Sequence, residues 1–472
     1  MGFASRAWCG PLVLGLVLLA AAPREESPAA PIAVAAGHPS RLHLRATTTR
    51  IRDNRTIVET VDVAGTRRLV RRCREDLCTG TWFDGKQLAD FGINGTPFPQ
   101  TGSEVDVLIT YAAIISTEFA EPDFAGQVEP LAAAGDTERF RVLVPGGVAL
   151  IAVANARTHD LLRIEALDGS VLGTLSANRV GDTTLYGDHP YQSVVRVAEP
   201  LRGPTGPPTT IAGESDIPIV SPTLPIVPCI VDERHANCLI DTGTTPSGIT
   251  LDFAERLKRE PHGEMEISAL GSYVTGVIDI ASLSIGSATI KQLRTVVVPQ
   301  TRGLNFDVIL GSDALAGMRI IFDPARHSVH IGESTLHGGG TEIPLQFDGG
   351  IPYVSAKLSA TSASQRLVFD TGDNGTFSIP FDAYRINQGL FPPLKNVKTY
   401  GLGGSADAIS GQLPSANIGA LTLERADIQA VRGLPEGHVG YALAERCGRL
   451  AIDFNQRRID CFDRERTPPR MP

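Results

Sequence analysis

The chain contains two copies of one sequence plan, and this duplication constrains its fold more than any other feature. In each copy three apolar residues lead directly into an Asp-Thr-Gly triplet, which ends at Gly243 in the first copy and at Gly372 in the second. A hydrophobic residue followed by glycine comes later in each copy, and that glycine, Gly311 or Gly440, lies 70 residues after the aspartate of the triplet. Apolar runs of this length bounded by turn residues are typical of buried strands. We therefore expect two β-rich halves of one design.

Each triplet combines residue types that suit an acid–base site. The apolar run buries a strand and places a carboxyl group at its end, glycine permits a turn that other residues resist, and the threonine hydroxyl can donate and accept hydrogen bonds. A single triplet would be interpreted as a tight turn, but two copies favour a site with paired acids. The candidate acids are Asp241 and Asp370, supported by Thr242, Gly243, Thr244, Thr371 and Gly372.

Two carboxyl groups held close together share one proton, because both cannot ionise comfortably. The ionised member can take a proton from a bound water molecule, and the protonated member can donate to a substrate carbonyl. The expected chemistry is hydrolysis by general acid–base catalysis, without a covalent intermediate and without a metal or other cofactor.

These residues resemble the aspartic proteases, and the short repeat is closer to the retropepsin-like and bacterial aspartyl protease families than to pepsin. The resemblance rests on Ile240-Asp241-Thr242-Gly243-Thr244, on Phe369-Asp370-Thr371-Gly372 and on Val308-Ile309-Leu310-Gly311. It implies a mainly β, two-lobed barrel fold in a single chain, with lobes at 215–335 and 341–463. It also implies that Asp241 and Asp370 form the catalytic pair and that Thr242 and Thr371 interlock between the two loops.

The family also has a hairpin flap that closes over the substrate. Gly271 and Tyr273 lie about 30 residues after the first aspartate, and Gly401 and Gly403 lie about 30 residues after the second, where glycine suits a tight turn. These four residues are flap candidates. Ordinary hairpin turns remain the alternative.

One departure from the family pattern concerns the residue after the triplet. The first copy has Thr244 there, a hydroxyl residue that the family favours, whereas the second copy has Asp373. An acid that faced inward at this position would disfavour ionisation of Asp370. It could equally point to solvent.

The N-terminus predicts export. Arg6 and the apolar stretch from Leu12 to Ala22 form a signal peptide over residues 1–22, because the apolar run is short for a membrane anchor, which is the alternative. No later segment is apolar enough to span a bilayer. We expect a periplasmic or extracellular protein.

The cysteine spacing agrees with an exported protein. Six cysteines beyond the leader fall into neighbouring pairs, which suggests disulfides, although six cysteines allow 15 connectivities and a zinc site is the rival interpretation. The zinc site is disfavoured because no Cys-x-x-Cys pair exists. The expected pairs are Cys73 with Cys78, Cys229 with Cys238 and Cys447 with Cys461.

Residues 40–200 form a separate β-rich accessory domain in this interpretation, with a short helix near Glu104–Thr117. The domain loosely resembles periplasmic lipoprotein carriers, and a Gly/Pro/Thr-rich stretch at 201–216 separates it from the duplicated part.

The net charge of −9, spread without long charged runs, argues against a nucleic-acid partner. We expect an exported aspartic endopeptidase that acts as a monomer on peptide or protein substrates. The alternative is a non-catalytic peptide- or lipid-binding protein that retains the protease fold.

Overall fold

A computed structural model of the 472-residue chain describes residues 43–462. The description omits residues 53–54, 101–102, 116–117, 122–123, 175–177, 181–182, 187–188, 192, 197–199, 270, 300–304, 333–339, 360, 393 and 402–403. The signal peptide expected at residues 1–22 lies outside the described residues, as does the flap candidate Gly403.

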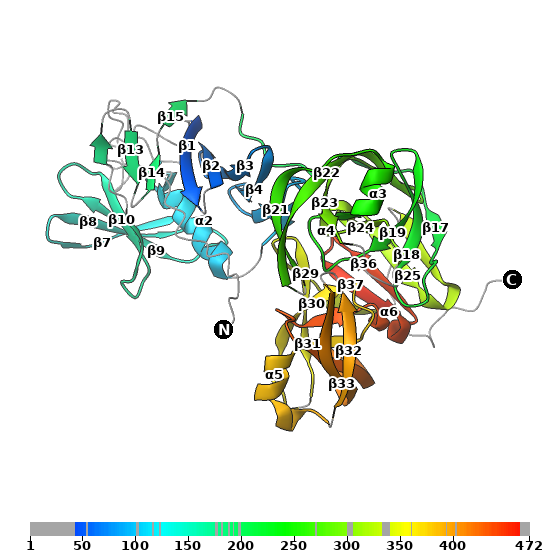
Figure 1. The fold of residues 1–472 in the computed structure, drawn as a ribbon. Coiled ribbons are helices and arrows are strands. Elements are labelled where there is room, and N and C mark those ends of the chain that lie inside the picture. Colours follow the sequence, from blue (N-terminus) through cyan, green and yellow to red (C-terminus); the bar gives the residue numbers. More distant parts are fainter. Residues whose placement is uncertain are drawn as a thin grey trace. The chain divides into compact units, whose positions relative to one another are not determined.

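The chain forms two compact units. The first contains the residues up to Phe91 together with Pro97–Pro204, and the second contains Gly92–Thr96 and the residues from Thr205 onward. Five residues from within the expected accessory domain thus belong to the second unit. Both units are built mainly from strands (Figure 1), so the prediction of a mainly β chain is confirmed.

The first unit contains a seven-stranded, a five-stranded and a three-stranded antiparallel sheet. The seven-stranded sheet has the order β15 (Ser193–Arg196), β1 (His43–Arg52), β2 (Arg55–Ala64), β3 (Arg67–Arg74), β4 (Leu77–Phe83), β5 (Leu88–Phe91) and β6 (Pro97–Pro99). The five-stranded sheet has the order β11 (Val171–Thr174), β10 (Leu161–Glu165), β9 (Leu150–Asn155), β8 (Thr137–Leu143) and β7 (Gln127–Ala134). The smallest sheet comprises β12 (Asn178–Val180), β13 (Thr183–Tyr186) and β14 (His189–Tyr191).

Helix α2 (Ser103–Ile115) confirms the helix expected in this region, and a short 3-10 turn, η2 (Glu118–Ala120), follows it. One hydrophobic cluster joins the helix to both larger sheets, because Ile114 packs with Val70 of β3 and Leu150 of β9. None of the helices that the structure describes has the length and apolar character needed to cross a membrane.

The second unit contains two eight-stranded sheets, one for each copy of the sequence plan. The first sheet has the order β16 (Thr209–Ile211), β23 (Ala288–Val298), β20 (Gly248–Thr250), β24 (Val308–Leu310), β19 (Arg234–Ile240), β18 (Ile226–Val231), β22 (Gly271–Ile285) and β21 (His262–Ala269). Strand β16 precedes the start expected at residue 215. The second sheet has the order β28 (Gln346–Asp348), β29 (Ile351–Lys357), β30 (Gln365–Asp370), β35 (His438–Gly440), β31 (Phe377–Pro380), β34 (Leu421–Val431), β33 (Gly404–Ile418) and β32 (Lys395–Gly401).

The two eight-stranded sheets share one pairing pattern around their Asp-Thr-Gly triplets. The strand that leads into the triplet pairs in parallel with a short central strand, β19 with β24 and β30 with β35. That central strand then pairs antiparallel with the strand that follows the triplet, β20 or β31. β24 is apolar and buried throughout, whereas β35 is buried at Val439 and Gly440 but begins with the partly buried His438.

A six-stranded sheet contains strands from both copies. Its order is β17 (Ser215–Pro218), β26 (Ser328–Gly332), β25 (Arg319–Asp323), β36 (Arg449–Asp453), β37 (Arg458–Phe462) and β27 (Thr341–Pro344). The copies meet where β25 pairs antiparallel with β36, and Ile320 lies opposite Ile452 there, both fully buried. The short helices of this unit are α3 (Leu251–Arg256), α4 (Ser312–Leu315), α5 (Phe381–Ile386) and α6 (Ala442–Cys447), with the turns η3 (Pro324–Arg326) and η4 (Gln388–Leu390).

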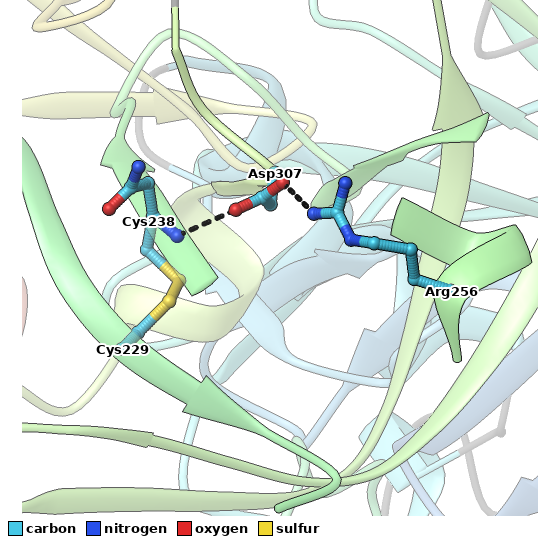
Figure 2. Close-up of a disulfide and its surroundings, with 5 residues drawn as sticks. Cys229, Cys238, Arg256 and Asp307 are labelled. Carbon is cyan, nitrogen blue, oxygen red and sulfur yellow. Dashed lines mark hydrogen bonds and ion pairs between the residues drawn. A yellow bond between two sulfur atoms is a disulfide. The ribbon is translucent and has the colours of Figure 1, made fainter. Parts of the chain in front are cut away.

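Three disulfides link cysteines that are neighbours in the sequence: Cys73 with Cys78, Cys229 with Cys238, and Cys447 with Cys461. Figure 2 shows the disulfide between Cys229 of β18 and Cys238 of β19. Strand β19 leads into the first triplet. Beside it, the Asp307 carboxylate accepts a hydrogen bond from the backbone N–H of Asn237 at 2.9 Å and forms an ion pair with Arg256. Through these two contacts Asp307 connects β19 to helix α3.

Candidate active site

Each candidate acid lies at the end of a buried strand that leads into its triplet. Asp241 follows β19 directly, and its backbone N–H donates to the carbonyl of Leu310 at 3.0 Å. Asp370 is the last residue of β30 and lies opposite Gly440. In each case a short parallel strand, β24 or β35, pairs with the strand that ends at the aspartate and fixes its position.

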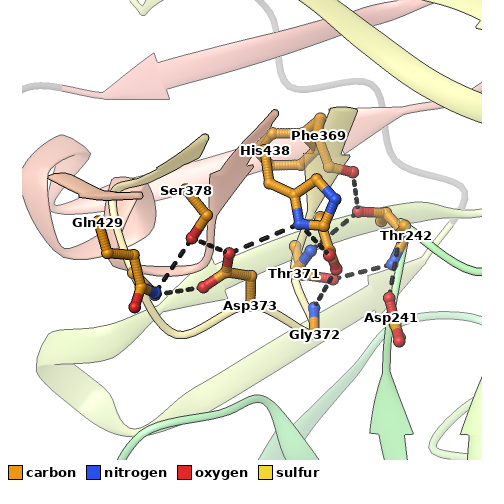
Figure 3. A network of polar contacts seen from close by, with 12 residues as sticks. Asp241, Thr242, Phe369, Thr371, Gly372, Asp373, Ser378, Gln429 and His438 are labelled. Carbon is orange, nitrogen blue, oxygen red and sulfur yellow. Dashed lines mark hydrogen bonds and ion pairs between the residues drawn. The ribbon is translucent and has the colours of Figure 1, made fainter. Parts of the chain in front are cut away.

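The two loops are joined by four reciprocal hydrogen bonds between buried groups. The hydroxyl of Thr242 donates to the carbonyl of Phe369 at 2.6 Å and accepts the N–H of Thr371 at 3.1 Å. The hydroxyl of Thr371 donates to the carbonyl of Ile240 at 2.8 Å and accepts the N–H of Thr242 at 3.0 Å. Figure 3 shows this contact between the loops, which fixes the position of each acid relative to the other.

The glycines of the triplets lie directly against the opposite carboxyl groups. A Cβ atom on Gly372 would lie 2.5 Å from Oδ2 of Asp241, and a Cβ atom on Gly243 would lie 2.6 Å from Oδ1 of Asp370. Both distances are too short for any side chain, so glycine is required here by space. Each glycine also donates its N–H to the carboxylate of its own loop, at 3.0 Å for Asp241 and 2.9 Å for Asp370.

The structure therefore brings Asp241 and Asp370 together in one buried site, and their protonation differs. Burial, together with the charge and the hydrogen bond of Asp370, raises the pKa of Asp241 well above its usual range. Burial also acts to raise the pKa of Asp370, but His438 and the hydrogen bonds from Asp241 and Gly372 outweigh it and lower that pKa. Asp241 is therefore the member of the pair that keeps a proton to higher pH, and Asp370 is the member that ionises first.

His438 is the cation next to this pair. Its Nδ1 atom lies 3.1 Å from Oδ2 of Asp370 and 3.6 Å from Oδ2 of Asp373 (Figure 3). Burial by itself would lower the pKa of the imidazole, but hydrogen bonding and the charges of the two aspartates raise the pKa of His438 to about 10.

Asp373 faces inward, which decides between the two orientations left open by the sequence. Its Oδ1 accepts the N–H of Gly375 at 2.8 Å, and its Oδ2 accepts the hydroxyl of Ser378, which in turn accepts from the Gln429 amide at 3.1 Å. Asp373 does not raise the pKa of Asp370 overall, because the hydrogen bond and the charge of His438, whose Nδ1 lies near both carboxylates, lower that pKa.

The first loop is supported by a different acid. The buried carboxylate of Asp313 accepts the N–H and the hydroxyl of Ser247, the latter at 2.7 Å, and it also accepts the side-chain amide of Asn94 at 2.5 Å. The hydroxyl of Thr96 donates to the backbone carbonyl of Asp313 at 2.9 Å. The segment Gly92–Thr96 is therefore part of the framework behind the first loop.

Thr244 contributes through its backbone, because its carbonyl accepts the N–H of Ser312 at 2.9 Å. The corresponding carbonyl in the second loop, that of Asp373, accepts the N–H of Tyr441 at 2.6 Å. The two loops are thus held in the same way at this position, although their side chains differ.

The three flap candidates that the structure describes, Gly271, Tyr273 and Gly401, belong to two long hairpins. Gly271 begins β22 opposite Ala269, and Tyr273 pairs with Ile267 in the same β21–β22 hairpin. Gly401 ends β32 opposite Gly404, in the β32–β33 hairpin.

A cavity of about 500 Å³ borders the second loop. Residues 375–377, which follow the triplet, form one wall, and residues of β32, β33 and β34 form the others, among them Lys395, Gln412 and Asp427. The lining is therefore partly polar and carries charges of both signs.

The sequence interpretation missed His438, Asp313 and Asn94. A signal for His438 was present: alignment of the copies places it opposite Ile309, so an ionisable residue replaces a buried aliphatic one. Asn94 had no such signal, because it lies more than 200 residues before its partner Asp313.

Part of the chain that contains the first triplet is similar to a known protein family. Residues 227–314 match the family model described as "Aspartyl protease". No curated protein matches the chain.

Among solved structures, a retropepsin-like aspartic protease from Rickettsia conorii has 18% sequence identity and a TM-score of 0.20, over 26% of this chain and 92% of the other. A second structure, MucB in complex with MucA(peri), has 11% identity and a TM-score of 0.11, over 55% of this chain and 90% of the other. The segment that matches the aspartyl protease family model contains the first triplet and Asp241.

Proposed function

We propose that the protein is an exported aspartic endopeptidase that hydrolyses peptide bonds with a water molecule activated between Asp241 and Asp370. In this proposal residues 215–335 and 341–463 are the two lobes of an aspartic-protease fold that arose by duplication. Residues 40–200 are an accessory domain, and Thr242, Gly243, Thr244, Thr371 and Gly372 support the active loops.

One observation carries the proposal: two Asp-Thr-Gly loops interlock through their threonines, and each carboxyl group lies directly against the glycine of the opposite loop. A structural turn does not require a pair of buried acids, because an unneeded buried carboxyl group costs stability. Perturbed titration of paired acids is instead typical of catalytic sites.

The charge distribution assigns a role to each acid. Asp370, the ionised member, takes a proton from water as the water oxygen attacks the carbonyl carbon of the peptide bond. Asp241, the protonated member, donates its proton to the carbonyl oxygen. Asp370 then returns its proton to the amide nitrogen while Asp241 recovers a proton from the hydroxyl group, and the C–N bond breaks to give an acid and an amine.

An extended peptide is the substrate that suits this site. The β21–β22 and β32–β33 hairpins, with Gly271, Tyr273 and Gly401, offer strand edges that can pair with a substrate backbone. The cavity beside the second loop offers room for a side chain of the substrate. Its lining with Lys395 and Asp427 favours a polar side chain there.

Export is supported by the three disulfides, which form in oxidising compartments, and by the signal peptide expected at residues 1–22. Both copies needed for the chemistry lie in one chain, so a monomer is sufficient.

The proposal is tested by incubating the full chain with a denatured protein between about pH 3 and pH 7, with and without a statine-type transition-state mimic. We expect cleavage that the mimic blocks and that Asp241→Asn and Asp370→Asn each abolish. Asp382→Asn is the matched control, because this aspartate is exposed in helix α5 and contacts neither loop. Full activity of Asp370→Asn would refute the paired mechanism. Tight binding of a peptide or lipid without turnover at any pH would favour a binding protein instead.

A further inference from the structure

We propose that His438 is a positioning residue that keeps Asp370 as the ionised acid and thereby places the shared proton on Asp241. This inference rests on the proposed proteolytic function and assigns a direction to its chemistry. Without a fixed charge on one side, two carboxyl groups related by approximate symmetry would exchange roles freely.

His438 lies close to Asp370 and is largely shielded from solvent. The imidazole Nδ1 lies 3.1 Å from the Asp370 carboxylate, and the His438 side chain is 19% exposed, so solvent screens the interaction only weakly. An opposite charge at this distance favours the ionised form of a carboxyl group. The same imidazole has no direct contact with Asp241 among the described interactions, although its charge acts weakly on that group.

The two copies differ at the position of His438. The strand β24 of the first copy carries Ile309 at the position that His438 occupies in β35, and Ile309 is fully buried and cannot carry charge. The first copy likewise has Thr244 where the second has Asp373. The second copy alone therefore carries a cation and an additional anion at this place.

The charges of the ionisable groups around the two catalytic acids balance. Four ionisable groups meet here: Asp241 and Asp370 from the triplets, Asp373 from the following loop, and His438 from β35. With Asp241 protonated and His438 charged, their net charge is −1, the same as that of a pair of acids with one proton. Asp373 and His438 thus cancel each other, and the catalytic pair still holds a single proton.

Residues on neighbouring strands hold the surroundings of His438 in place. His438 lies opposite Ser378 in the register of β31 and β35, and Ser378 donates to the Asp373 carboxylate that flanks the imidazole. Gln429 holds Ser378 in turn. The imidazolium is therefore fixed between two anions by residues on three neighbouring segments, which a surface ion pair would not require (Figure 3).

The sign of the pH effect follows from these contacts. Activity requires Asp370 ionised, so it is lost as the pH falls through the pKa of Asp370, which His438 lowers. When the imidazole is removed, that pKa rises, because Asp370 loses the hydrogen bond and the opposite charge of His438. The nearby Asp373 carboxylate also loses its cation and adds a like charge. A neighbouring opposite charge lowers a carboxyl pKa by about 1–3 units. The acid limb of the kcat/KM profile should therefore move upward by about 1 pH unit or more.

The activity test compares His438→Ile, which copies the residue of the first lobe, with the matched control Ile309→Val. We expect the acid limb to move upward in His438→Ile and to stay in place in the control. The double variant His438→Ile with Asp373→Ser removes the uncompensated charge and should move the limb part of the way back. A uniform loss of kcat in His438→Ile at every pH, with the limb unmoved, would overturn the inference.

A second test does not depend on activity. In the full chain labelled with ¹⁵N-histidine, the His438 signal, identified by its absence in His438→Gln, should remain that of an imidazolium from pH 5 to beyond pH 8. Asp370→Asn should make it titrate at lower pH. A neutral imidazole at pH 7 in the unmodified chain would overturn the inference, whether or not the protein cleaves peptides. An imidazolium in a chain that cleaves nothing would leave this electrostatic role standing and refute the proteolytic function alone.

Discussion

Replacing Thr242 with valine removes one hydroxyl group from the contact between the two active loops and leaves its shape nearly unchanged. The hydroxyl makes two hydrogen bonds, to the carbonyl of Phe369 and from the N–H of Thr371, and Thr242 is fully buried. The substitution therefore leaves one buried carbonyl and one buried N–H without partners. Each such group costs about 1–3 kcal/mol, so we expect a loss of about 3 kcal/mol for the pair after partial relaxation.

Hydrogen exchange is the appropriate assay for this loss, because the chain has two units and its global unfolding is not a single transition. A loss of about 3 kcal/mol raises the population of the open state roughly 10²-fold. Exchange in peptides that contain the Thr371 amide should accelerate by that factor, and proteolytic activity should fall with it. Thr242→Ser is the matched control, since it keeps the hydroxyl. Equal exchange in the valine and serine variants would refute the claim that the reciprocal hydrogen bonds hold the loops together.

Other residues in and around the active loops give three more predictions. Gly372→Ala should abolish cleavage, because its Cβ would lie 2.5 Å from the Asp241 carboxylate, and a thermal melt should show whether the fold survives. Asn94→Ala removes an amide that bonds the buried Asp313 carboxylate and should lower the stability of the second unit by about 1–3 kcal/mol in urea unfolding. The pH profile of the unmodified protein should fall on the acid side below the usual carboxyl range, as Asp370 gains a proton. On the basic side it should fall above that range, as Asp241 loses its proton.

The local parts of the site were predictable from the sequence. A strand of three apolar residues that runs into Asp-Thr-Gly specifies its own turn, and the equal spacing to Gly311 and Gly440 indicated that the chain contains two copies of one plan. The short helix expected near Glu104–Thr117 likewise agrees with α2 at Ser103–Ile115. In each of these cases the residues that determine the structure are near one another in the chain or occur twice in it.

The electrostatic surroundings were not predictable in the same way. Whether Asp373 faces inward depends on Ser378 and His438, which belong to two other strands of the sheet. The role of Asn94 depends on a five-residue segment that leaves the first unit and joins the second. Such contacts are determined by the packing of distant segments, and no local residue pattern encodes them.

A crystal structure of the protein with a statine-type peptide would test the central claim most directly. The account predicts that the statine hydroxyl lies within hydrogen-bonding distance, about 2.6–3.2 Å, of the carboxyl groups of both Asp241 and Asp370. An inhibitor bound to one carboxyl group alone, or bound elsewhere with both groups unengaged, would contradict it.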